Sequence, residues 1–468
     1  GEVEYAEPNY QVKPASLPAS SGLVPNDPQF WNQWALNNPG FNVAGYPSTN
    51  GADIKATEAW QITTGNPDVL VAITDTGVDI THPDLAPNIY TNPGEIAGNG
   101  IDDDHNGYVD DVTGFDVADN NGDVSDVLGH GTEMAGIIGA VLNNRIGISG
   151  ICQCKMVPVK FFKKTGPDPT DVAATVADAA KAIIYSITIG ASIINASGDV
   201  MFEPGTFSPG EPKALRDAVS ACNDADVLLV CIAGNDGLST DINAVYPGHY
   251  ELPNQIVVAA SDYNDDLWHV LGLPSELKSN FGVNTVQIAA PGNLVLTTEA
   301  PGDCPLCTQS PDPNSWYTSI DGSSASAAYV SGVAALAKSL FPEANAPVLR
   351  RRILESADSI PQLTPYVSNG NRLNALGAVT IQLQITPPVL KKAKYKVSRQ
   401  VLVLSGTSIQ RGAHAIIGGT VYATVPTPGT IVPLQVSLPA SVFPSGVAIP
   451  VVLRNPDGGT SQTLTITR

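Results

Sequence analysis

The stretch "VLVAITDTGVDITHPDL" (residues 69–85) contains a short apolar run that ends abruptly in a carboxylate. Residues 69–74 are apolar at nearly every position rather than at alternate ones, which predicts a strand covered on both faces. Asp75 follows at once, with Thr76 and Gly77 behind it. A carboxylate at the tip of a buried strand is costly unless donors or a cationic partner surround it, so Asp75 is a candidate functional residue. The structural alternative is an aspartate that caps the following turn.

The region from about residue 55 to residue 360 repeats this pattern. Four further apolar runs are "MVPVKFF" (156–162), "ASIINAS" (191–197), "DVLLVCIAG" (226–234) and "NQIVVAAS" (254–261). Ala-rich segments with helical spacing lie between them, at 170–186 and 211–225. Strands alternating with helices predict an α/β fold, a doubly wound parallel sheet with helices on both faces. Such folds bind ligands outside the carboxyl ends of their strands.

The two ends of the chain have other patterns. After about residue 380, short alternating runs are separated by Gly, Pro and Asn turns without a helical segment. This pattern predicts a small all-β sandwich, Ig-like, over residues 381–468. Residues 1–25 are rich in Pro, Ser and Ala and predict an extended arm. Residues 26–380 then form the α/β domain.

The composition disfavours nucleic acid, membranes and zinc as partners of this chain. The chain has 24 Lys and Arg against 45 Asp and Glu, and a net charge of −21 disfavours binding to nucleic acid. No apolar run approaches the roughly 18 residues that cross a membrane, and no export signal is expected within this chain. The six cysteines favour local disulfides or free thiols over a zinc site at Cys304 and Cys307.

Two other stretches place reactive side chains at helix starts. In "DVLGHGTEMAGIIGAVLNN" (126–144), His130 lies between two glycines at the start of a small-residue helix. In "DGSSASAAYVSGVAALA" (321–337), Ser324 lies where a turn becomes a helix, whose free amides and dipole can stabilise negative charge. Taken singly, each residue also has a purely structural interpretation. His130 could be a histidine whose ring is hydrogen-bonded within the fold, and Ser324 could be the N-cap of its helix.

Taken together, "DTGVD", "GHGT" and "GSS", in the order Asp, His, Ser, resemble the subtilisin-like serine proteases over about residues 26–360. "VCIAGNDG" (230–237) matches the strand end where that family keeps an oxyanion asparagine, here Asn235. The resemblance implies a subtilisin-like fold and a secreted serine endopeptidase. Ser324 would be the nucleophile, His130 the general base and then acid, and Asp75 the residue that orients the imidazole. The Asn235 side chain and the Ser324 backbone amide would stabilise the oxyanion.

The resemblance also implies how a substrate binds. An extended protein or peptide substrate would pair with edge strands, and its P1 side chain would enter a pocket near Ser197, Gly198, Ala233 and Gly234.

The sequence leaves two alternatives to a hydrolase. Ala328 stands where the family keeps a proline, which raises the hypothesis of a peptide-ligating or cyclising transamidase that uses the same acyl-enzyme. A non-catalytic binding protein on a protease scaffold would require a missing catalytic group, and all four are present.

Calcium is the expected cofactor. In "NGIDDDHNGYVDD" (99–111), alternate positions offer oxygen ligands for Ca²⁺, and the alternative is a merely acidic turn. These ligands are Asp102, Asp104, Asn106, the Tyr108 carbonyl and Asp110. Thr113 stands where a bidentate Glu is expected, so Asp111 or Asp116 would complete the shell. The resemblance implies a second calcium site at Asp27, Asp84 and Asn144.

The amino-terminal arm resembles a piece of a propeptide. "VEYAEPNYQV" (3–12) is similar to the last strand of the family's inhibitory propeptide, so the chain's own propeptide is expected as inhibitor and chaperone. We expect a monomer that binds neither nucleic acid nor a membrane.

Overall fold

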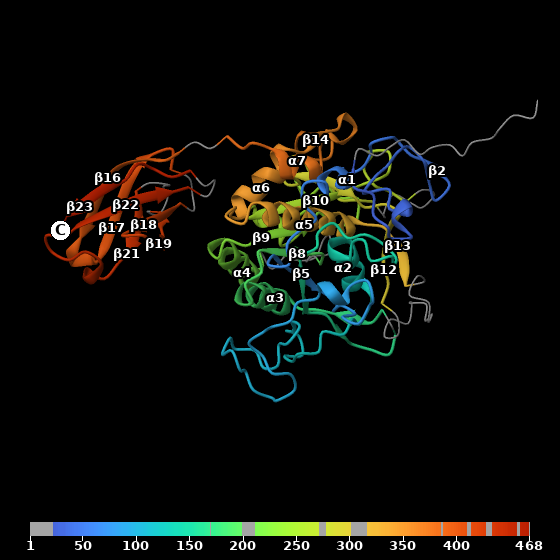
Figure 1. Cartoon of the computed structure of the whole chain (residues 1–468), viewed down its shortest axis with the longest axis horizontal. Helices are drawn as coiled ribbons and strands as arrows, with labels where there is room; N and C mark the ends of the chain where they lie inside the picture. The colour runs from blue at the N-terminus through green and yellow to red at the C-terminus, as the bar shows by residue number, and fades with distance from the viewer. Residues whose placement is uncertain are drawn as a thin grey trace, which may run out of the picture.

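The computed structural model contains an α/β unit followed by an all-β unit (Figure 1). It describes residues 22–168, 170–198, 211–270, 278–300, 316–384, 387–409, 413–426, 433–455 and 459–467. Most of the predicted arm and the pair Cys304 and Cys307 lie outside these residues. The four described cysteines, Cys152, Cys154, Cys222 and Cys231, are free buried thiols.

The α/β unit is built on a nine-stranded sheet. Its strand order is β14 (Asp358–Ser359), β15 (Asn371–Arg372), β11 (Ile288–Pro291), β10 (Gln255–Ser261), β9 (Leu228–Ile232), β8 (Ile193–Ala196), β3 (Leu70–Asp75), β5 (Lys155–Lys160) and β4 (Phe115–Asp116). All neighbours pair in parallel except β14 with β15. In chain order, β4 and β5 are added on one side of β3, and the later strands β8 to β11 are added on the other. The direction of winding therefore reverses between β3 and β8. Ligands bind open α/β sheets at such a point.

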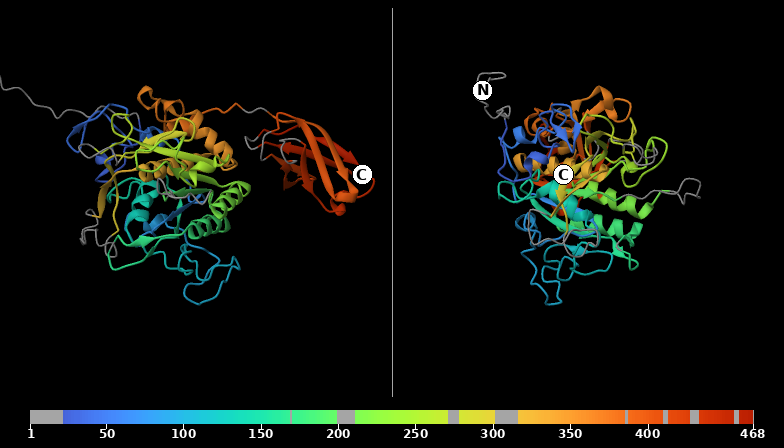
Figure 2. Two further views of the ribbon diagram at one scale, coloured as in Figure 1. Left: turned by 180° about the vertical axis from the view of Figure 1, so that it is seen from behind. Right: turned by 90° about the vertical axis from the view of Figure 1, so that its right-hand side faces the viewer.

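Helices cover both faces of this sheet, as predicted (Figures 1 and 2). One face packs against α2 (His130–Gly139) and α5 (Ser323–Leu340), with α6 (Ala346–Glu355) and α7 (Ala375–Thr380) beside α5 and α1 (Ala56–Ala59) beside α7. The other face packs against α3 (Val176–Thr188) and α4 (Lys213–Asp224). In β3, Val71 and Ile73 join the first core and Ala72 the second. This double burial explains why the run is apolar at every position.

The helix predicted over 170–186 begins later, at Val176. Thr175 caps it with Asp178 in a reciprocal capping box, which fixes the start. Upstream, β7 (Val172–Ala173) pairs with β6 (Lys163–Lys164).

The remaining short elements of the α/β unit lie around the sheet. Strands β12 (Val295–Thr298) and β13 (Tyr317–Ile320) form an antiparallel pair against α2, and β1 (Asn42–Val43) pairs with β2 (Tyr46–Pro47). Its 3₁₀ helices are Phe30–Asn32, Ala86–Asn88, Gly248–Tyr250, Pro361–Leu363 and Ser368–Gly370. No described helix has the length and apolar character to span a lipid bilayer.

The C-terminal unit consists of two four-stranded antiparallel sheets. One has the order β16 (Val389–Lys396), β17 (Val401–Thr407), β21 (Leu434–Ser437), β20 (Val425–Pro426). The other has the order β19 (Thr420–Ala423), β18 (His414–Ile417), β22 (Ala448–Arg454), β23 (Leu464–Thr467). The 3₁₀ helices Val397–Arg399 and Ala440–Val442 connect strands. Leu402 and Leu404 from the first sheet share one buried cluster with Val451 and Leu453 from the second. The unit therefore fits the predicted all-β fold, while the boundaries 26–380 and 381–468 stay predictions.

Candidate active site

Asp75 and His130 meet at the end of the central strand. Asp75 is the last residue of β3, and His130 is the first residue of α2. The Asp75 Oδ1 accepts hydrogen bonds from His130 Nδ1 at 2.7 Å and from the Thr76 amide at 2.8 Å. Because Nδ1 donates to the carboxylate, Nε2 of a neutral ring is the nitrogen that can accept a proton. Burial opposes the charged imidazolium, but the charge and hydrogen bond of Asp75 outweigh it and raise the pKa of His130 to about 9.

Ser324 lies at the same edge of the sheet. It is the second residue of α5, is 8% exposed, and donates its Oγ to the Ser197 carbonyl at 3.3 Å. Ser197 directly follows β8, in which Ala196 is the register partner of Thr74 in β3. Adjacent strands lie about 4.8 Å apart, so Ser197 and Asp75 leave the ends of neighbouring strands. The hydroxyl and the Asp75–His130 pair thus come from the same edge.

Asn235 is held by the residue before the serine. Its Oδ1 accepts from the Ser323 backbone amide at 2.8 Å and from Ser323 Oγ at 2.9 Å. The same hydroxyl accepts from the Gly234 amide at 3.2 Å. A Cβ on Gly322, whose φ is +131°, would lie 3.2 Å from Asn235 Nδ2. The amide plane is therefore fixed, with its donor nitrogen beside the turn that carries Ser324.

The four predicted substrate residues are neighbours in space. Ser197 and Gly198 follow β8, whereas Ala233 and Gly234 follow β9, and these two strands pair in parallel. A Cβ on Gly198 would lie 3.1 Å from the Phe161 ring. The absence of a side chain there keeps the backbone close to that ring.

Asp126 is a central residue that sequence reasoning missed. The residue is 4% exposed, and its carboxylate accepts five hydrogen bonds. The donors are Thr76 Oγ1 at 2.7 Å, the Leu128 and Gly129 amides at 3.0 and 2.8 Å, and the Thr132 amide and Oγ1 at 2.9 and 2.6 Å. Thr76 Oγ1 also accepts from the Gly131 amide at 3.0 Å. One carboxylate thus ties the residue after Asp75 to the turn that holds His130. The only sequence signal was an aspartate shortly before a helix start.

Glu133 also lies close to the Asp75–His130 pair. It is one helical turn from His130, where side chains share a face. Thr297 Oγ1 donates to its carbonyl, which fixes this turn of α2 against β12. Burial, together with the charges of Asp126, Asp75 and Glu299, raises the pKa of Glu133 to about 7 in spite of His130.

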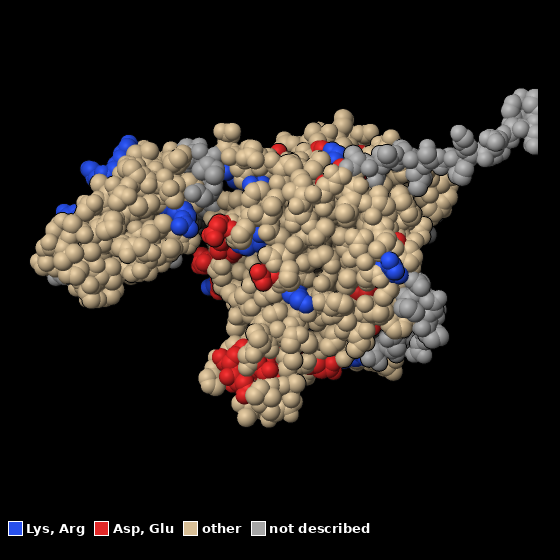
Figure 3. All heavy atoms as spheres, viewed as in Figure 1, with Lys and Arg blue, Asp and Glu red and all other residues tan. Residues whose placement is uncertain are grey.

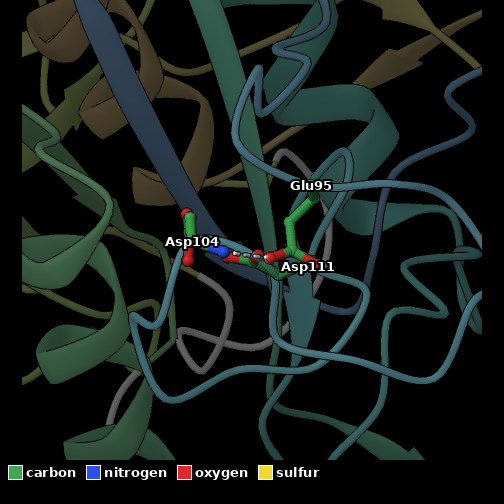
Figure 4. A group of neighbouring side chains, drawn as sticks. All are labelled: Glu95, Asp104 and Asp111. Carbon is green, nitrogen blue, oxygen red and sulfur yellow. Dashed lines mark hydrogen bonds between the residues drawn. The ribbon is translucent and has the colours of Figure 1, made fainter.

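The predicted calcium loop gathers a different set of carboxylates. Glu95, Asp104 and Asp111 offer oxygens that all lie within 4.8 Å of one another (Figure 4). Asp111 is fully buried, and it accepts from Tyr185 Oη at 2.8 Å. The Asn106 Nδ2 donates to both Asp104 and Asp111, at 3.1 and 3.0 Å.

The other predicted ligands of this loop have separate partners. The Asp102 carboxylate accepts from the amides of Asn106 and Gly107, and the Asp110 carboxylate from those of Asn99 and Gly100. Tyr108 packs its ring against Phe115 and Tyr185, and Asp116 is paired with Lys160 at 3.2 Å. Glu95 was missed because it precedes the motif.

The residues of the second predicted calcium site do lie together. The Asn144 amide donates to Asp27 Oδ1 at 3.0 Å, and its Nδ2 donates to Asp84 Oδ1 at 2.6 Å. Asp27 is 2% exposed and Asp84 fully buried. Burial raises the pKa of Asp84 to about 7, although Ile148, Asn144 and Tyr317 donate hydrogen bonds to it. Tyr317 was not predicted from the sequence.

Comparisons with known proteins agree with this geometry. A family model described as "Subtilase family" matches residues 66–379. The "Thermophilic serine proteinase" of Bacillus sp. (strain AK1) is 30% identical over 379 residues, which cover 81% of this chain and 73% of that protein. An "Extracellular protease" of Xanthomonas campestris pv. campestris is 28% identical, covering 80% of this chain and 60% of that protein.

The fold has solved counterparts. A protease of Pseudoalteromonas arctica PAMC 21717 superposes with a TM-score of 0.55 at 24% identity, covering 76% of this chain and 98% of that one. The family match spans most of the α/β unit and includes Asp75, His130 and Ser324. The chain therefore belongs to the subtilase family and is a subtilisin-like serine endopeptidase.

Proposed function

We propose that this endopeptidase hydrolyses peptide bonds with Ser324 as nucleophile, His130 as general base and acid, and Asp75 as the residue that orients the imidazole. The observation that supports this most is the 2.7 Å hydrogen bond from His130 Nδ1 to a buried Asp75, beside the strand end that holds Ser324. A serine hydroxyl is a weak nucleophile near neutral pH, so it needs an adjacent base to react.

The steps follow from these positions. Ser324 Oγ exchanges the Ser197 carbonyl for His130 Nε2, attacks the scissile carbonyl carbon and gives its proton to the ring. The oxyanion then accepts from Asn235 Nδ2 and the Ser324 amide, which act where the negative charge develops. The imidazolium returns the proton to the leaving amine as the carbon–nitrogen bond breaks. Water repeats the sequence on the acyl-enzyme and releases Ser324.

A covalent probe tests the role of Ser324. A fluorophosphonate probe should label the wild-type chain stoichiometrically, and Ser324→Ala should abolish both labelling and peptide hydrolysis. Ser326→Ala is a matched control, because Ser326 lies in the same turn but donates to the Ala290 carbonyl at 2.9 Å. If Ser324→Ala were still labelled while remaining folded, this assignment would be wrong.

The ends of β8 and β9 would form the substrate cleft. An extended peptide would pair with the backbone near Ser197 and Gly198, and its P1 side chain would lie by Ala233 and Gly234. The transamidase alternative uses the same acyl-enzyme and stays a prediction. Product analysis with an added amine separates the two, because a ligase forms a new amide and a hydrolase releases acid.

Calcium would stabilise the fold at two places. The oxygens of Glu95, Asp104 and Asp111 suit a hard divalent cation, and so do those of Asp27, Asp84 and Asn144. The buried pair Asp27 and Asp84 supports this fit, because two neighbouring carboxylates away from water are unfavourable unless neutralised. In this role the ion supplies positive charge to structural loops and takes no part in the chemistry.

Localisation and partners remain part of the proposal. The name of the Xanthomonas relative supports a secreted protein. Residues 3–12, which lie outside the described part of the chain, would belong to a propeptide that inhibits and chaperones the enzyme, and the mature enzyme would be a monomer. Amino-terminal sequencing of the secreted active form tests this: a form that retains residues 3–12 contradicts their removal.

A further inference from the structure

Charge is divided unequally along the chain. Residues 381–468 contain eight Lys and Arg but one Asp or Glu, whereas residues 1–380 contain 16 and 44. The two parts carry formal charges of +7 and −28, which together give the −21 of the whole chain. Such a difference between parts of one chain points to separate electrostatic partners.

Most of the positive charge of the C-terminal unit lies on or just after one strand. Lys391, Lys392, Lys394 and Lys396 belong to β16, and Arg399 ends the 3₁₀ helix that follows. All five side chains are exposed. In Figure 3 blue side chains gather at the upper edge of this unit, where Figure 1 labels β16, and no red ones are visible on this face of the unit.

Strand geometry arranges three of these lysines in a row. Ala393 and Tyr395 pack on the core of the unit, and the Tyr395 hydroxyl donates to the Leu438 carbonyl at 2.8 Å. Because side chains alternate along a strand, Lys392, Lys394 and Lys396 project from the opposite, outer face. Neighbours in this lysine row are about 6.6 Å apart along the strand. Lys391 lies at a register shift beside the row.

Among the described residues of its own unit, the lysine row has no acidic neighbour. None of the residues described between 387 and 467 is Asp or Glu, and no described carboxylate forms an ion pair with the row. Lysines on an edge strand also prevent aggregation. That function does not require charges of one sign at consecutive outer positions, where they repel one another. An external polyanion would neutralise them.

The residues beside the row restrict the kind of polyanion. Ser405, Val403 and Val401 of β17 lie opposite Lys392, Lys394 and Lys396. These partners supply no aromatic ring on which a nucleic-acid base could stack, and no wide apolar face for insertion into a bilayer. What remains is evenly spaced charge with small or aliphatic neighbours, which suits a hydrophilic linear polymer.

We propose that the lysine row on β16 binds a linear polysaccharide that carries carboxylate groups. The α/β unit is strongly acidic and is repelled by the same polymer, so contact is confined to the C-terminal unit. The enzyme would thereby be held on the polymer while its cleft stays free for protein substrates.

Binding to immobilised alginate tests the proposal on the full chain with the Ser324→Ala substitution, which prevents self-digestion. We expect retention at low salt and elution as NaCl rises, with no retention on neutral dextran. Lys394→Gln with Lys396→Gln should weaken binding at least tenfold and lower the slope of log Kd against log salt by about two, through counterion release.

A matched double variant separates location from net charge. Lys163→Gln with Lys164→Gln removes two exposed lysines from β6 of the α/β unit and should bind alginate as the parent does. Equal weakening by both double variants would overturn the proposal, as would retention on dextran. Tighter binding to poly(dT) or to phosphatidylglycerol vesicles than to alginate would also overturn it, in favour of nucleic acid or membrane.

Discussion

Replacing Asp126 by Asn should impair catalysis without touching Asp75, His130 or Ser324. The Asp126 carboxylate accepts five hydrogen bonds, three on Oδ1 and two on Oδ2. An asparagine can keep the three donors of Oδ1, but its NH₂ group then faces the Thr132 amide, so that bond is lost, and the Thr132 hydroxyl must reverse to accept from the NH₂ group. Hydrogen bonds to a charged group contribute about 1.5 to 3 kcal/mol each, so the lost bond alone lowers the unfolding free energy by roughly that amount.

The activity should fall for a separate reason. Asp126 holds the turn that carries His130, and a shift of about 1 Å in a reacting group costs about 100-fold in rate. We therefore expect kcat/KM to fall roughly 10- to 100-fold, chiefly through kcat. The negative charge of Asp126 also helps to raise the pKa of His130. The imidazole must be neutral to act as a base. Loss of the Asp126 charge lowers the pKa of His130 and therefore moves the acid limb of the kcat/KM profile to lower pH.

Two measurements on the same preparations distinguish this positioning role from simple destabilisation. They are kcat and kcat/KM as a function of pH, and the thermal unfolding temperature. Asp116→Asn is the matched control: Asp116 is 1% exposed and accepts from the Ala118 and Asp119 amides, but it pairs with Lys160 and not with the active site. It should lower the unfolding temperature and leave the pH profile in place. If Asp126→Asn lowered only stability, with kcat and pH profile like those of Asp116→Asn, the positioning role would be refuted.

Three further outcomes are expected. Glu133→Gln removes a negative charge that helps to raise the pKa of His130, so the acid limb of the kcat/KM profile should shift to lower pH. Glu133→Asp keeps the charge and should keep the wild-type profile. An unchanged profile in Glu133→Gln would contradict this reasoning. Ser323→Ala removes one of the two hydrogen bonds that Asn235 Oδ1 accepts from Ser323, and it should lower kcat about tenfold with little change in KM, whereas Ser323→Thr should restore kcat; a change in KM alone would exclude an oxyanion effect. Chelation of calcium should lower the unfolding temperature by roughly 5 to 10 °C, which is the shift expected when an ion present at about 100 times its Kd is removed. Asp84→Asn and Asp104→Asn should each lose part of that response. Equal unfolding temperatures with and without chelator would contradict a stabilising role for calcium.

The sequence predicted the central sheet because burial leaves a local record. Runs such as residues 69–74 are apolar at every position, and β3 does send alternate side chains into two cores. The family, the order of the three motifs and the all-β character of the C-terminal unit were also visible in short windows. The start of α3 was predicted six residues early because the capping box of Thr175 and Asp178 overrides the apolar spacing before it.

What the amino-acid order determined by itself is the type of each local segment and which reactive side chains stand at strand ends and helix starts. Only the tertiary structure decided which polar atoms meet. Glu95 joined Asp104 and Asp111 in place of Asp102 and Asp110, and Asp126 gathered donors from Thr76 to Thr132. The physical reason is the distance along the chain over which each signal acts. Periodic burial is visible within a few residues of sequence. A hydrogen bond requires its two atoms to be placed within tenths of an ångström, and the packing of loops that are distant in the sequence sets those positions.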